Sequence, residues 1–329
     1  MEPAKHLDKK IGTDEVRSEP NRNGYGEGLL MAGERDGRVV ALCADLTEST
    51  RTHLFAQAFP ERFIQVGIAE QNMASVASGM ASMGKIPFIA SYAMFSPGRS
   101  WEQVRTTIAY NDSNVKIIGA HAGVSVGPDG ATHQAIEDMA IMRVMPNMVV
   151  IDPCDTIEAR KAVLASVAYK GPVYIRLGRE STPVVTTEAS PFTIGKGEWF
   201  VRKDPAHTRS IGLIVAGTVA HSAMVASSIL DKEGVGVSVV NLPTIKPLDT
   251  DILDELAENH DSIATVEEHQ IAGGLGGAVA EYYSSTRPVR VTRIGIQDQF
   301  GQSGSPEQLL AHYGLDVPGI VEQLRAIPE

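Results

Sequence analysis

Apolar and polar positions alternate in blocks along the first half of the chain. Six short blocks are apolar on both faces and rich in β-branched residues, which is typical of strands buried on both sides. These blocks are residues 38–45, 62–68, 86–93, 114–121, 147–153 and 172–178. Longer stretches with helical patterns separate them, at residues 23–36, 69–84, 100–112 and 155–169. Strands and helices in alternation predict crossover connections, and therefore a mostly parallel sheet with helices on both faces.

This alternation is interrupted once and then resumes on a smaller scale. The interruption is polar and contains proline and threonine, which indicates a linker over residues 186–208. The 329 residues are enough for two domains of common size. We therefore predict an α/β protein of two domains, each a mostly parallel sheet flanked by helices. Their expected ranges are 21–185 and 209–329, after a flexible tail over residues 1–20.

Composition and charge exclude several classes of protein. Hydrophobic residues make up 43% of the chain and charged residues 21%, as in an ordinary globular protein. The net charge of -11 argues against a nucleic-acid partner, which requires clustered Lys and Arg. No apolar run approaches the roughly 20 residues that span a bilayer, and the polar first twenty residues lack the apolar core of a secretion signal. We expect a soluble, cytoplasmic protein without membrane contact.

The two cysteines do not indicate a disulfide or a metal site. Cys43 and Cys154 lie far apart, without a CxxC pair or neighbouring histidines. Both are interpreted as small core residues. The glycines at 273–277 miss the GxGxxG spacing, and they indicate the tight start of a helix with either a packing role or contact with an anion.

Polar side chains gather just after the predicted strands of the first domain. Ligands of open α/β sheets bind at the carboxyl ends of the strands, so these residues are candidates for one crevice. They are Asp45, Ser49, Glu70, His121, Asp129, His133 and Arg179. Each also has an ordinary structural explanation when taken alone: an acid such as Glu70 is favoured electrostatically in the first turn of a helix. The small residues that follow Glu70 are typical of close helix packing.

Four segments taken together resemble the C-terminal half of transketolase, the thiamine-diphosphate enzyme. They read "DLTEST", "GIAEQNM", "HAGVSVGPDGATHQAIEDMAIMR" and "VEEHQIAGGLGGAVAE". The resemblance covers the chain after residue 20, in the order and spacing of the family, and is closest to the split form in which this half is a separate polypeptide. It implies a pyrimidine-binding domain over 21–185 and a transketolase C-terminal domain over 209–329. It also implies an N-terminal partner subunit in an α2β2 heterotetramer.

The same resemblance implies the residues that contact the cofactor. Glu70 falls on the acid that hydrogen-bonds the aminopyrimidine ring nitrogen, where a shared proton favours the tautomer that activates the thiazolium ring. Asp45, Tyr92 and Phe95 are further expected cofactor contacts, the two rings stacking near the aminopyrimidine. Tyr92 stands where the family more often has Phe. The family's GDG segment with a following Asn, which binds the diphosphate through metal, does not occur here. We therefore expect Mg²⁺ or Ca²⁺ to be bound mainly by the partner subunit, with no metal ligand from this chain.

The resemblance also implies a sugar-phosphate substrate. The positions expected to bind its phosphate are Arg22, Ser49, His121 and Arg179, which supply cations and donors suited to a dianion. Asp129 and His133 match residues that recognise hydroxyl groups, and His133 is also a candidate for proton transfer at the reacting carbonyl. Glu48 and Pro128 depart from the family pattern beside these residues.

Four functions remain open from the sequence. The first is ketol transfer between a ketose phosphate and an aldose by a split transketolase. The second is the chemistry of deoxyxylulose-phosphate synthase, which shares this two-domain half, as do the beta subunits of 2-oxo acid dehydrogenases. The third is a ketol transferase of a specialised sugar or natural-product pathway. The fourth is a non-catalytic partner subunit, against which the presence of Glu70 with the substrate residues argues.

Overall fold

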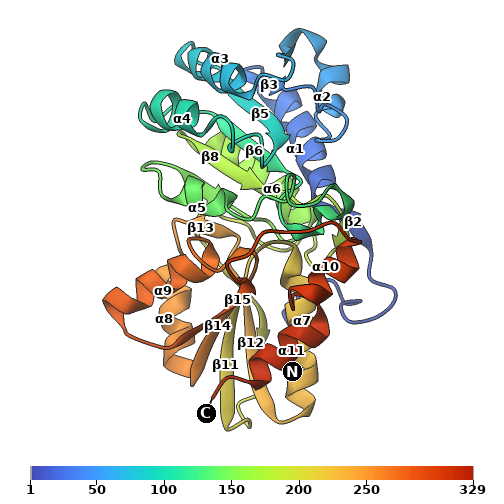
Figure 1. Ribbon diagram of the computed structural model, residues 1–329, viewed down its shortest axis with the longest axis vertical. Helices are drawn as coiled ribbons and strands as arrows, with labels where there is room; N and C mark the ends of the chain where they lie inside the picture. The colour runs from blue at the N-terminus through green and yellow to red at the C-terminus, as the bar shows by residue number, and fades with distance from the viewer. Residues whose placement is uncertain (1, 329) are drawn as a thin grey trace.

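Two α/β domains lie one above the other along the long axis of the molecule (Figure 1). The computed structural model describes residues 2–328. The upper domain contains most of the first half of the chain and the lower domain most of the second half. The predicted fold class, two domains of mostly parallel sheet flanked by helices, is confirmed.

The first domain is built on a sheet of seven strands. Their order across the sheet is β13 (Thr244–Lys246), β7 (Val149–Ile151), β8 (Val173–Arg176), β6 (Lys116–Ala120), β5 (Ile86–Tyr92), β3 (Val39–Cys43) and β4 (Phe63–Gln65). Every neighbouring pair is parallel except β13 with β7. Because β13 belongs to the second half of the sequence, the two domains share a sheet edge. A small separate sheet pairs β2 (Ser18–Pro20) with β9 (Ser181–Pro183).

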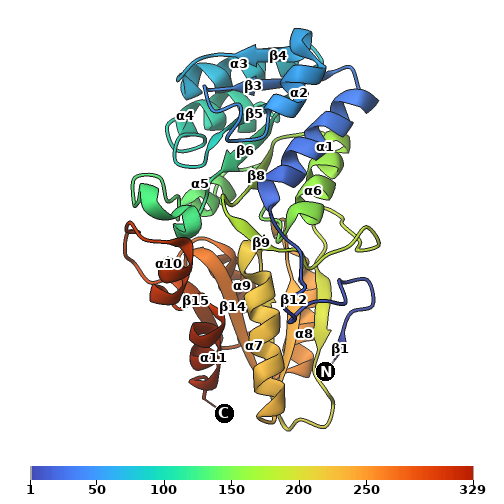
Figure 2. The ribbon, with the colours of Figure 1, turned by 90° about the vertical axis from the view of Figure 1, so that its right-hand side faces the viewer.

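Helices cover both faces of this sheet (Figure 2). One face carries α1 (Asn21–Arg35), α2 (His53–Ala58) and α6 (Thr156–Ala168). The other carries α3 (Glu70–Ser82), α4 (Trp101–Gln103) with the π-helix η2 (Val104–Ala109), and α5 (Asp138–Arg143). On α1, a Cβ atom at Gly24 would lie 1.8 Å from the carbonyl oxygen of Thr156, so α1 and α6 pack too closely for a side chain there. On α3, an added Cβ at Gly79 would meet open space.

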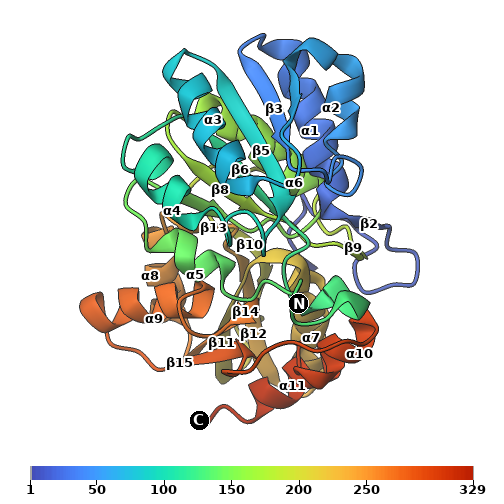
Figure 3. The same ribbon diagram turned by 45° about the horizontal axis from the view of Figure 1, so that its top comes forward.

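The second domain has a six-stranded sheet. Its order is β1 (Glu2–Pro3), β10 (Glu198–Arg202), β12 (Val235–Asn241), β11 (Arg209–Val215), β14 (Ser262–Gln270) and β15 (Val291–Ile296). The last four are parallel, whereas β1 and β10 run antiparallel to their neighbours. One face packs against α7 (Ala220–Lys232), α10 (Pro306–His312) and α11 (Val317–Arg325), and the other against α8 (Thr250–Asn259) and α9 (Leu275–Thr286). Helix α10 also contacts the 3-10 helix η3 (Val124–Asp129) of the first domain (Figure 3).

Several short elements were not predicted from the sequence. Helices α2 and α5 have six residues each, and η1 (Pro60–Arg62), η3 and η4 (Gly217–Val219) are shorter or distorted. Such lengths are too short to show a helical period. Within residues 2–328, none of the helices has both the length and the apolar content needed to cross a membrane.

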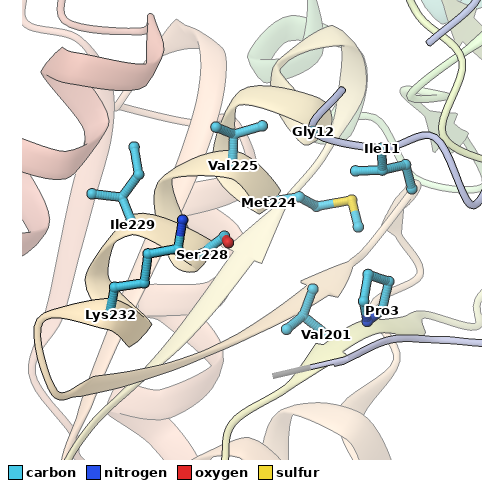
Figure 4. Close-up of a pocket in the computed structure, with 9 residues that line it drawn as sticks. All are labelled: Pro3, Ile11, Gly12, Val201, Met224, Val225, Ser228, Ile229 and Lys232. Carbon is cyan, nitrogen blue, oxygen red and sulfur yellow. The ribbon is translucent and has the colours of Figure 1, made fainter. Parts of the chain in front are cut away.

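The N-terminal segment differs from the predicted flexible tail. Strand β1 pairs with β10, the backbone N–H of Asp8 donates to the carbonyl of Val185 at 2.9 Å, and Leu7 is buried. The physical reason is that Leu7 joins the second-domain core, with Ile11 packed against it. The segment and α7 also enclose a largely apolar cavity of about 190 Å³ (Figure 4). Its lining includes Ile11 and Met224 and none of the candidate site residues.

The predicted linker over 186–208 also differs, because it contains β10. Phe200 and Val201 of this strand are buried, and β10 pairs with β12 through an irregular register. The strand was missed because its five residues, "EWFVR", mix charged and apolar side chains. The second-domain sheet therefore takes in a strand that begins at Glu198.

The glycines at 273–277 bind a carboxylate of this same chain. Glu267 at the end of β14 accepts hydrogen bonds from the backbone N–H groups of Leu275 and Gly276 at 2.7 and 2.8 Å. A Cβ at Gly274 would lie 2.0 Å from Glu267 Oε2, so glycine is required for this contact. Burial raises the pKa of Glu267 to about 7. Of the two roles that the sequence left open, the anion contact is thus made internally, at the N-terminus of α9.

Glu158 joins the two domains through a buried hydrogen bond. Its carboxylate accepts from the backbone N–H of Cys154 and from Asn241 Nδ2 of the second domain, both at 2.7 Å. Burial, followed by the charge of Asp155, raises the pKa of Glu158 to about 7. A raised pKa in the folded state means that protonation favours folding. The contribution is complete below about pH 4.3 and is lost as the pH rises past 7.

We expect Glu158→Gln to remove this pH dependence. The free energy of unfolding of the wild type, relative to the variant, should fall by up to about 3 kcal/mol between pH 4 and pH 8. The glutamine is tolerated if the Asn241 amide flips. Asn241 Oδ1, which has no partner within the described chain, then accepts from the glutamine NH₂ group, while the glutamine oxygen accepts from the Cys154 N–H. Denaturant unfolding at several pH values measures the difference. Glu61→Gln, at an exposed position, is the control, and parallel pH profiles for wild type and Glu158→Gln would contradict the prediction.

Candidate active site

The predicted site residues lie at the carboxyl edge of the first-domain sheet. Asp45 follows β3, Tyr92 ends β5, His121 follows β6, and Arg179 follows β8. Arg22 joins them from the first turn of α1. Parallel strands present their carboxyl ends on one side, which explains why residues distant in sequence converge. The backbone is left-handed at Asp45 (φ 60°) and His121 (φ 55°), a conformation that is uncommon for side chains other than glycine.

A neutral histidine lies beside the arginines. Arg22 Nη1 donates to the carbonyl of Ser49 at 2.8 Å and lies 3.1 Å from His121 Nε2. Because a guanidinium only donates, His121 Nε2 is the acceptor and the proton is on Nδ1. Burial, followed by the charge of Arg22, lowers the pKa of His121 to about 3. His121 Nδ1 is buried and has no hydrogen-bond partner among residues 2–328.

Two further arginines complete a cationic cluster around His121. Arg179 Nη1 donates to the carbonyl of Val126 at 2.7 Å and lies 3.5 Å from Asp129 Oδ1. Arg51 Nε donates to Asn23 Oδ1 at 2.8 Å, and Arg51 and Arg179 both contribute to lowering the pKa of His121. Arg51 is not among the residues predicted from the sequence, although it directly follows the segment "DLTEST". The cluster therefore consists of Arg22, Arg51 and Arg179.

Aromatic rings also contact His121. The Tyr92 ring stacks on the His121 ring with centroids 3.9 Å apart and an interplanar angle of 25°. The Phe95 ring is 5.8 Å from that of Tyr92 and meets His133 edge-on at 5.4 Å. His133 Nδ1 lies 2.9 Å from Thr132 Oγ1. Tyr92, Phe95 and the two histidines thus form one continuous aromatic group.

Glu70 is a buried acid at the start of α3. It is 3% exposed, and its two carboxylate oxygens lie 3.2 and 3.3 Å from Arg99 Nη1. Arg99 is half exposed and its guanidinium lies over the Phe95 ring at 4.2 Å. Arg99 is not among the residues predicted from the sequence, because a pair separated by 29 positions leaves no local pattern. The residue before Glu70 is Ala69, which has no capping side chain, so Glu70 is the acid nearest the positive end of this helix.

Asp45 and the two departures from the family pattern, Glu48 and Pro128, lie at the margin of this arrangement. Asp45 is exposed, its backbone N–H donates to Gln65 Oε1, and its carboxylate makes no hydrogen bond or ion pair within the described residues. Glu48 is exposed and pairs with His53 at 3.3 Å rather than with the arginines. Pro128 lies inside η3, next to Asp129. The structure therefore brings Glu70, the aromatic group and the arginine cluster together, with Asp45 outside their contacts.

Two family descriptions match the chain. "Transketolase, pyrimidine binding domain" matches residues 20–184, and "Transketolase, C-terminal domain" matches residues 203–320. Within residues 2–328, no three His, Cys, Asp or Glu side chains are grouped so that they could hold a metal ion.

Known proteins similar to the chain belong to the same family. A putative transketolase C-terminal section from Methanocaldococcus jannaschii is 44% identical over 306 residues, which are 92% of this chain and 94% of that protein. A 6-deoxy-6-sulfo-D-fructose transketolase subunit from a Clostridium species is 36% identical over 308 residues, 94% of each chain. A solved structure described as "Split gene transketolase, inactive beta4 tetramer" superposes with a TM-score of 0.84 at 40% identity, covering 93% of this chain and 97% of that chain. The chain belongs to the transketolase family. It corresponds to the C-terminal half of these enzymes, which comprises the pyrimidine-binding and C-terminal domains.

Proposed function

We propose that the chain is the C-terminal subunit of a split, thiamine-diphosphate-dependent transketolase. It transfers a two-carbon ketol unit from a ketose phosphate to an aldose acceptor, together with an N-terminal partner subunit. One observation carries the proposal: a chain of contacts links the buried carboxylate of Glu70, through Arg99, to the ring of Phe95, and the same aromatic group reaches the arginine cluster at His121. Such a site suits a flat heterocycle at one end and an anionic sugar at the other.

The residues near Glu70 fit the aminopyrimidine of thiamine diphosphate. Both Glu70 oxygens share one long contact to Arg99, so the carboxylate keeps capacity for a second donor. When bound, the cofactor supplies the nucleophilic carbon that C–C bond cleavage requires. In the proposal Glu70 holds a proton at the ring nitrogen, while Tyr92 and Phe95 orient the ring and exclude water.

The arginine cluster fits a tetrahedral anion. Arg22 and Arg179 provide several N–H donors, and the unpartnered Nδ1–H of His121 adds a neutral one. We assign these residues, with Ser49, to the phosphate of the substrate. We assign Asp129 and His133 to its hydroxyl groups, with His133 as the candidate for proton transfer at the carbonyl.

The surface beside Glu70 fits contact with other subunits. The outer face of α3 carries small exposed residues such as Ser75 and Gly79, and Ile68 and Met83 are 73% and 82% exposed. Large exposed apolar side chains, here one at each end of α3, are typical of protein interfaces. We infer self-association and an α2β2 complex in which the partner binds the diphosphate through Mg²⁺ or Ca²⁺. The inactive β4 tetramer of the similar split-gene structure supports this inference.

Reconstitution tests the proposal. The purified chain alone should show no ketol transfer and negligible affinity for thiamine diphosphate with Mg²⁺, because the diphosphate-binding motif is absent. Mixing with a transketolase N-terminal subunit that contains GDG and Asn should restore both. Calorimetry with the cofactor and a coupled assay of ketose-phosphate turnover measure them. Micromolar cofactor binding by the isolated chain, or no turnover by the assembled pair with any ketose phosphate, would contradict the proposal.

A second candidate is ketol transfer in a specialised sugar pathway. The Clostridium relative bears the name of a sulfosugar transketolase subunit. A sulfonate, like a phosphate, is a tetrahedral anion that arginines bind, so the cluster accommodates either. Comparing donors that differ only in the terminal group separates the two candidates. Preference for a sulfonate-terminated ketose would favour the specialised function.

A further inference from the structure

A carboxylate of the second domain contacts the loop that runs from His121 to Asp129 in the candidate site. Glu268, near the end of β14, is 2% exposed. Its Oε1 accepts the backbone N–H of Ser125 at 2.6 Å, and its Oε2 accepts the hydroxyl of Thr218 at 2.9 Å. A Cβ at Gly123, where φ is +87°, would lie 2.3 Å from Glu268 Oε1. The loop therefore passes so close to the carboxylate that only glycine fits at this position.

The loop that is hydrogen-bonded to Glu268 also accepts a hydrogen bond from an arginine of the cationic cluster. Ser125 is followed by Val126, whose carbonyl accepts from Arg179 Nη1 at 2.7 Å. The same loop begins at His121 and ends at Asp129. A short chain of contacts thus runs from the Glu268 carboxylate through the Ser125–Val126 backbone to the Arg179 guanidinium.

The second domain reaches Arg179 by another route as well. The backbone carbonyl of Glu268 accepts from Arg176 Nη2 at 2.7 Å, on the strand that leads to Arg179. A Cβ at Gly178, the residue before Arg179, would lie 3.1 Å from the methyl group of Thr218. Both segments next to Arg179 therefore rest on Glu268 or on its partner Thr218.

We propose that Glu268 is a positioning residue for the anion-binding end of the substrate site, and that this is a task of the C-terminal domain. The inference rests on the proposed function. A loop with left-handed glycines at 123 and 127 has access to many backbone conformations. A buried carboxylate that accepts a backbone N–H makes a strong, directional bond, which selects one conformation. Misplacement of Arg179 by a fraction of an ångström should weaken anion binding.

Steady-state kinetics of the reconstituted complex test the role. For Glu268→Ala we expect the KM of a ketose phosphate to rise about ten-fold, with kcat changed less than about three-fold. The KM of hydroxypyruvate, which has no phosphate, should stay within two-fold. Glu268→Gln should recover most of the affinity, because its amide oxygen accepts from Ser125 and its NH₂ group donates to Thr218 Oγ1.

Glu267→Ala is the matched control. Glu267 is the neighbouring residue on β14, is equally buried, and binds the start of α9 instead of the loop. We expect it to lower the melting temperature without changing the ratio of the two KM values. Equal KM increases for both donors in Glu268→Ala, or the same ratio change in Glu267→Ala, would overturn the proposal. If Glu268→Ala does not fold, Thr218→Val removes the second hydrogen bond of the carboxylate and should raise the phosphate-donor KM in the same selective way.

Hydrogen exchange of the full chain gives a readout that does not depend on ketol transfer. The Ser125 amide should exchange at least ten-fold faster in Glu268→Ala than in wild type, but not in Glu267→Ala. Titration of the full chain with inorganic phosphate should show about ten-fold weaker binding in Glu268→Ala only. A wild-type complex without ketol transfer would refute the proposed function and leave these two measurements to decide the role of Glu268. Unchanged exchange, or unchanged phosphate affinity with faster exchange, would overturn it.

Discussion

Glu70→Gln should slow exchange of the thiazolium proton of bound thiamine diphosphate by a factor on the order of 10²–10⁴. The side chain is 3% exposed, so no water can replace the missing carboxylate. A glutamine is nearly the same size, which preserves packing at the start of α3 and assembly with the partner. Its amide cannot share a proton with the ring nitrogen as a carboxylate can. Exchange followed by NMR after rapid quenching of the reconstituted complex measures the effect.

Two further variants separate this role from a structural one. Glu102→Gln changes an exposed acid in the first turn of α4, in the same domain, and should leave the exchange rate unchanged. Arg99→Gln removes the ion-pair partner of Glu70 and should have a much smaller effect than Glu70→Gln. If exchange in Glu70→Gln proceeds at the wild-type rate with the cofactor bound, Glu70 is only a helix-start acid. Wild-type turnover by a complex that contains Glu70→Gln would support the alternative that this chain is a non-catalytic partner subunit.

Arg179→Ala should lower kcat/KM for a ketose phosphate by roughly ten- to hundred-fold. The lost contact is a charge-assisted bond in a partly shielded site, worth about 1.5–3 kcal/mol. Arg179 is about one-third exposed and is held by the Val126 carbonyl, so its position is set before substrate binds. Hydroxypyruvate should lose far less efficiency, because it lacks the remote phosphate. Remote binding energy also positions the reacting carbon, so kcat is expected to fall with the phosphorylated donor.

The comparison between donors is internal to one variant and therefore tolerates errors in enzyme concentration. Arg38→Ala is the control, since Arg38 precedes β3 at the opposite edge of the sheet and is exposed there. Burial, followed by the charge of Arg22, lowers the pKa of His121 to about 3, so His121 should stay neutral beside the cluster between pH 5 and pH 8. Any pH dependence of the donor ratio in that range should follow the ionisation of the substrate phosphate. Equal losses for both donors would mean that Arg179 is structural.

The strands of the first domain were predictable because their burial is nearly uniform. Every residue of β3 and of β6 is buried, so the apolar runs at 38–45 and 114–121 identify them without any periodicity. Strand β10, which lies between β1 and β12, was missed because only part of it is buried. The N-terminal segment was missed because its contact with the core depends mainly on Leu7, a single apolar residue in a polar stretch. Local patterns report how a whole element is buried, and isolated contacts leave no such pattern.

Part of the candidate site was also predictable from the sequence. Residues that follow strands, such as His121 and Arg179, converge because parallel strands end on one side of a sheet. Arg99 was not selected, because its pairing with Glu70 arises from the fold and not from spacing. Asp45 was selected, but its carboxylate makes no contact with the other candidates within the described residues.

The sequence by itself determined the fold class, the family and the set of polar residues at the carboxyl edge of the first sheet. These follow from apolar periodicity and from motifs, both of which are local along the chain. Only the tertiary structure decided the chemical states and the supports of these residues. The pKa of His121 is lowered because the side chain is buried and because three arginines from separate segments lie close to it, which keeps the ring neutral. Glu268 accepts a hydrogen bond from the loop that contacts Arg179, although it lies more than 140 positions away in the sequence. The physical reason is that the packing of the two domains, and not sequence proximity, decides which buried groups become hydrogen-bond partners.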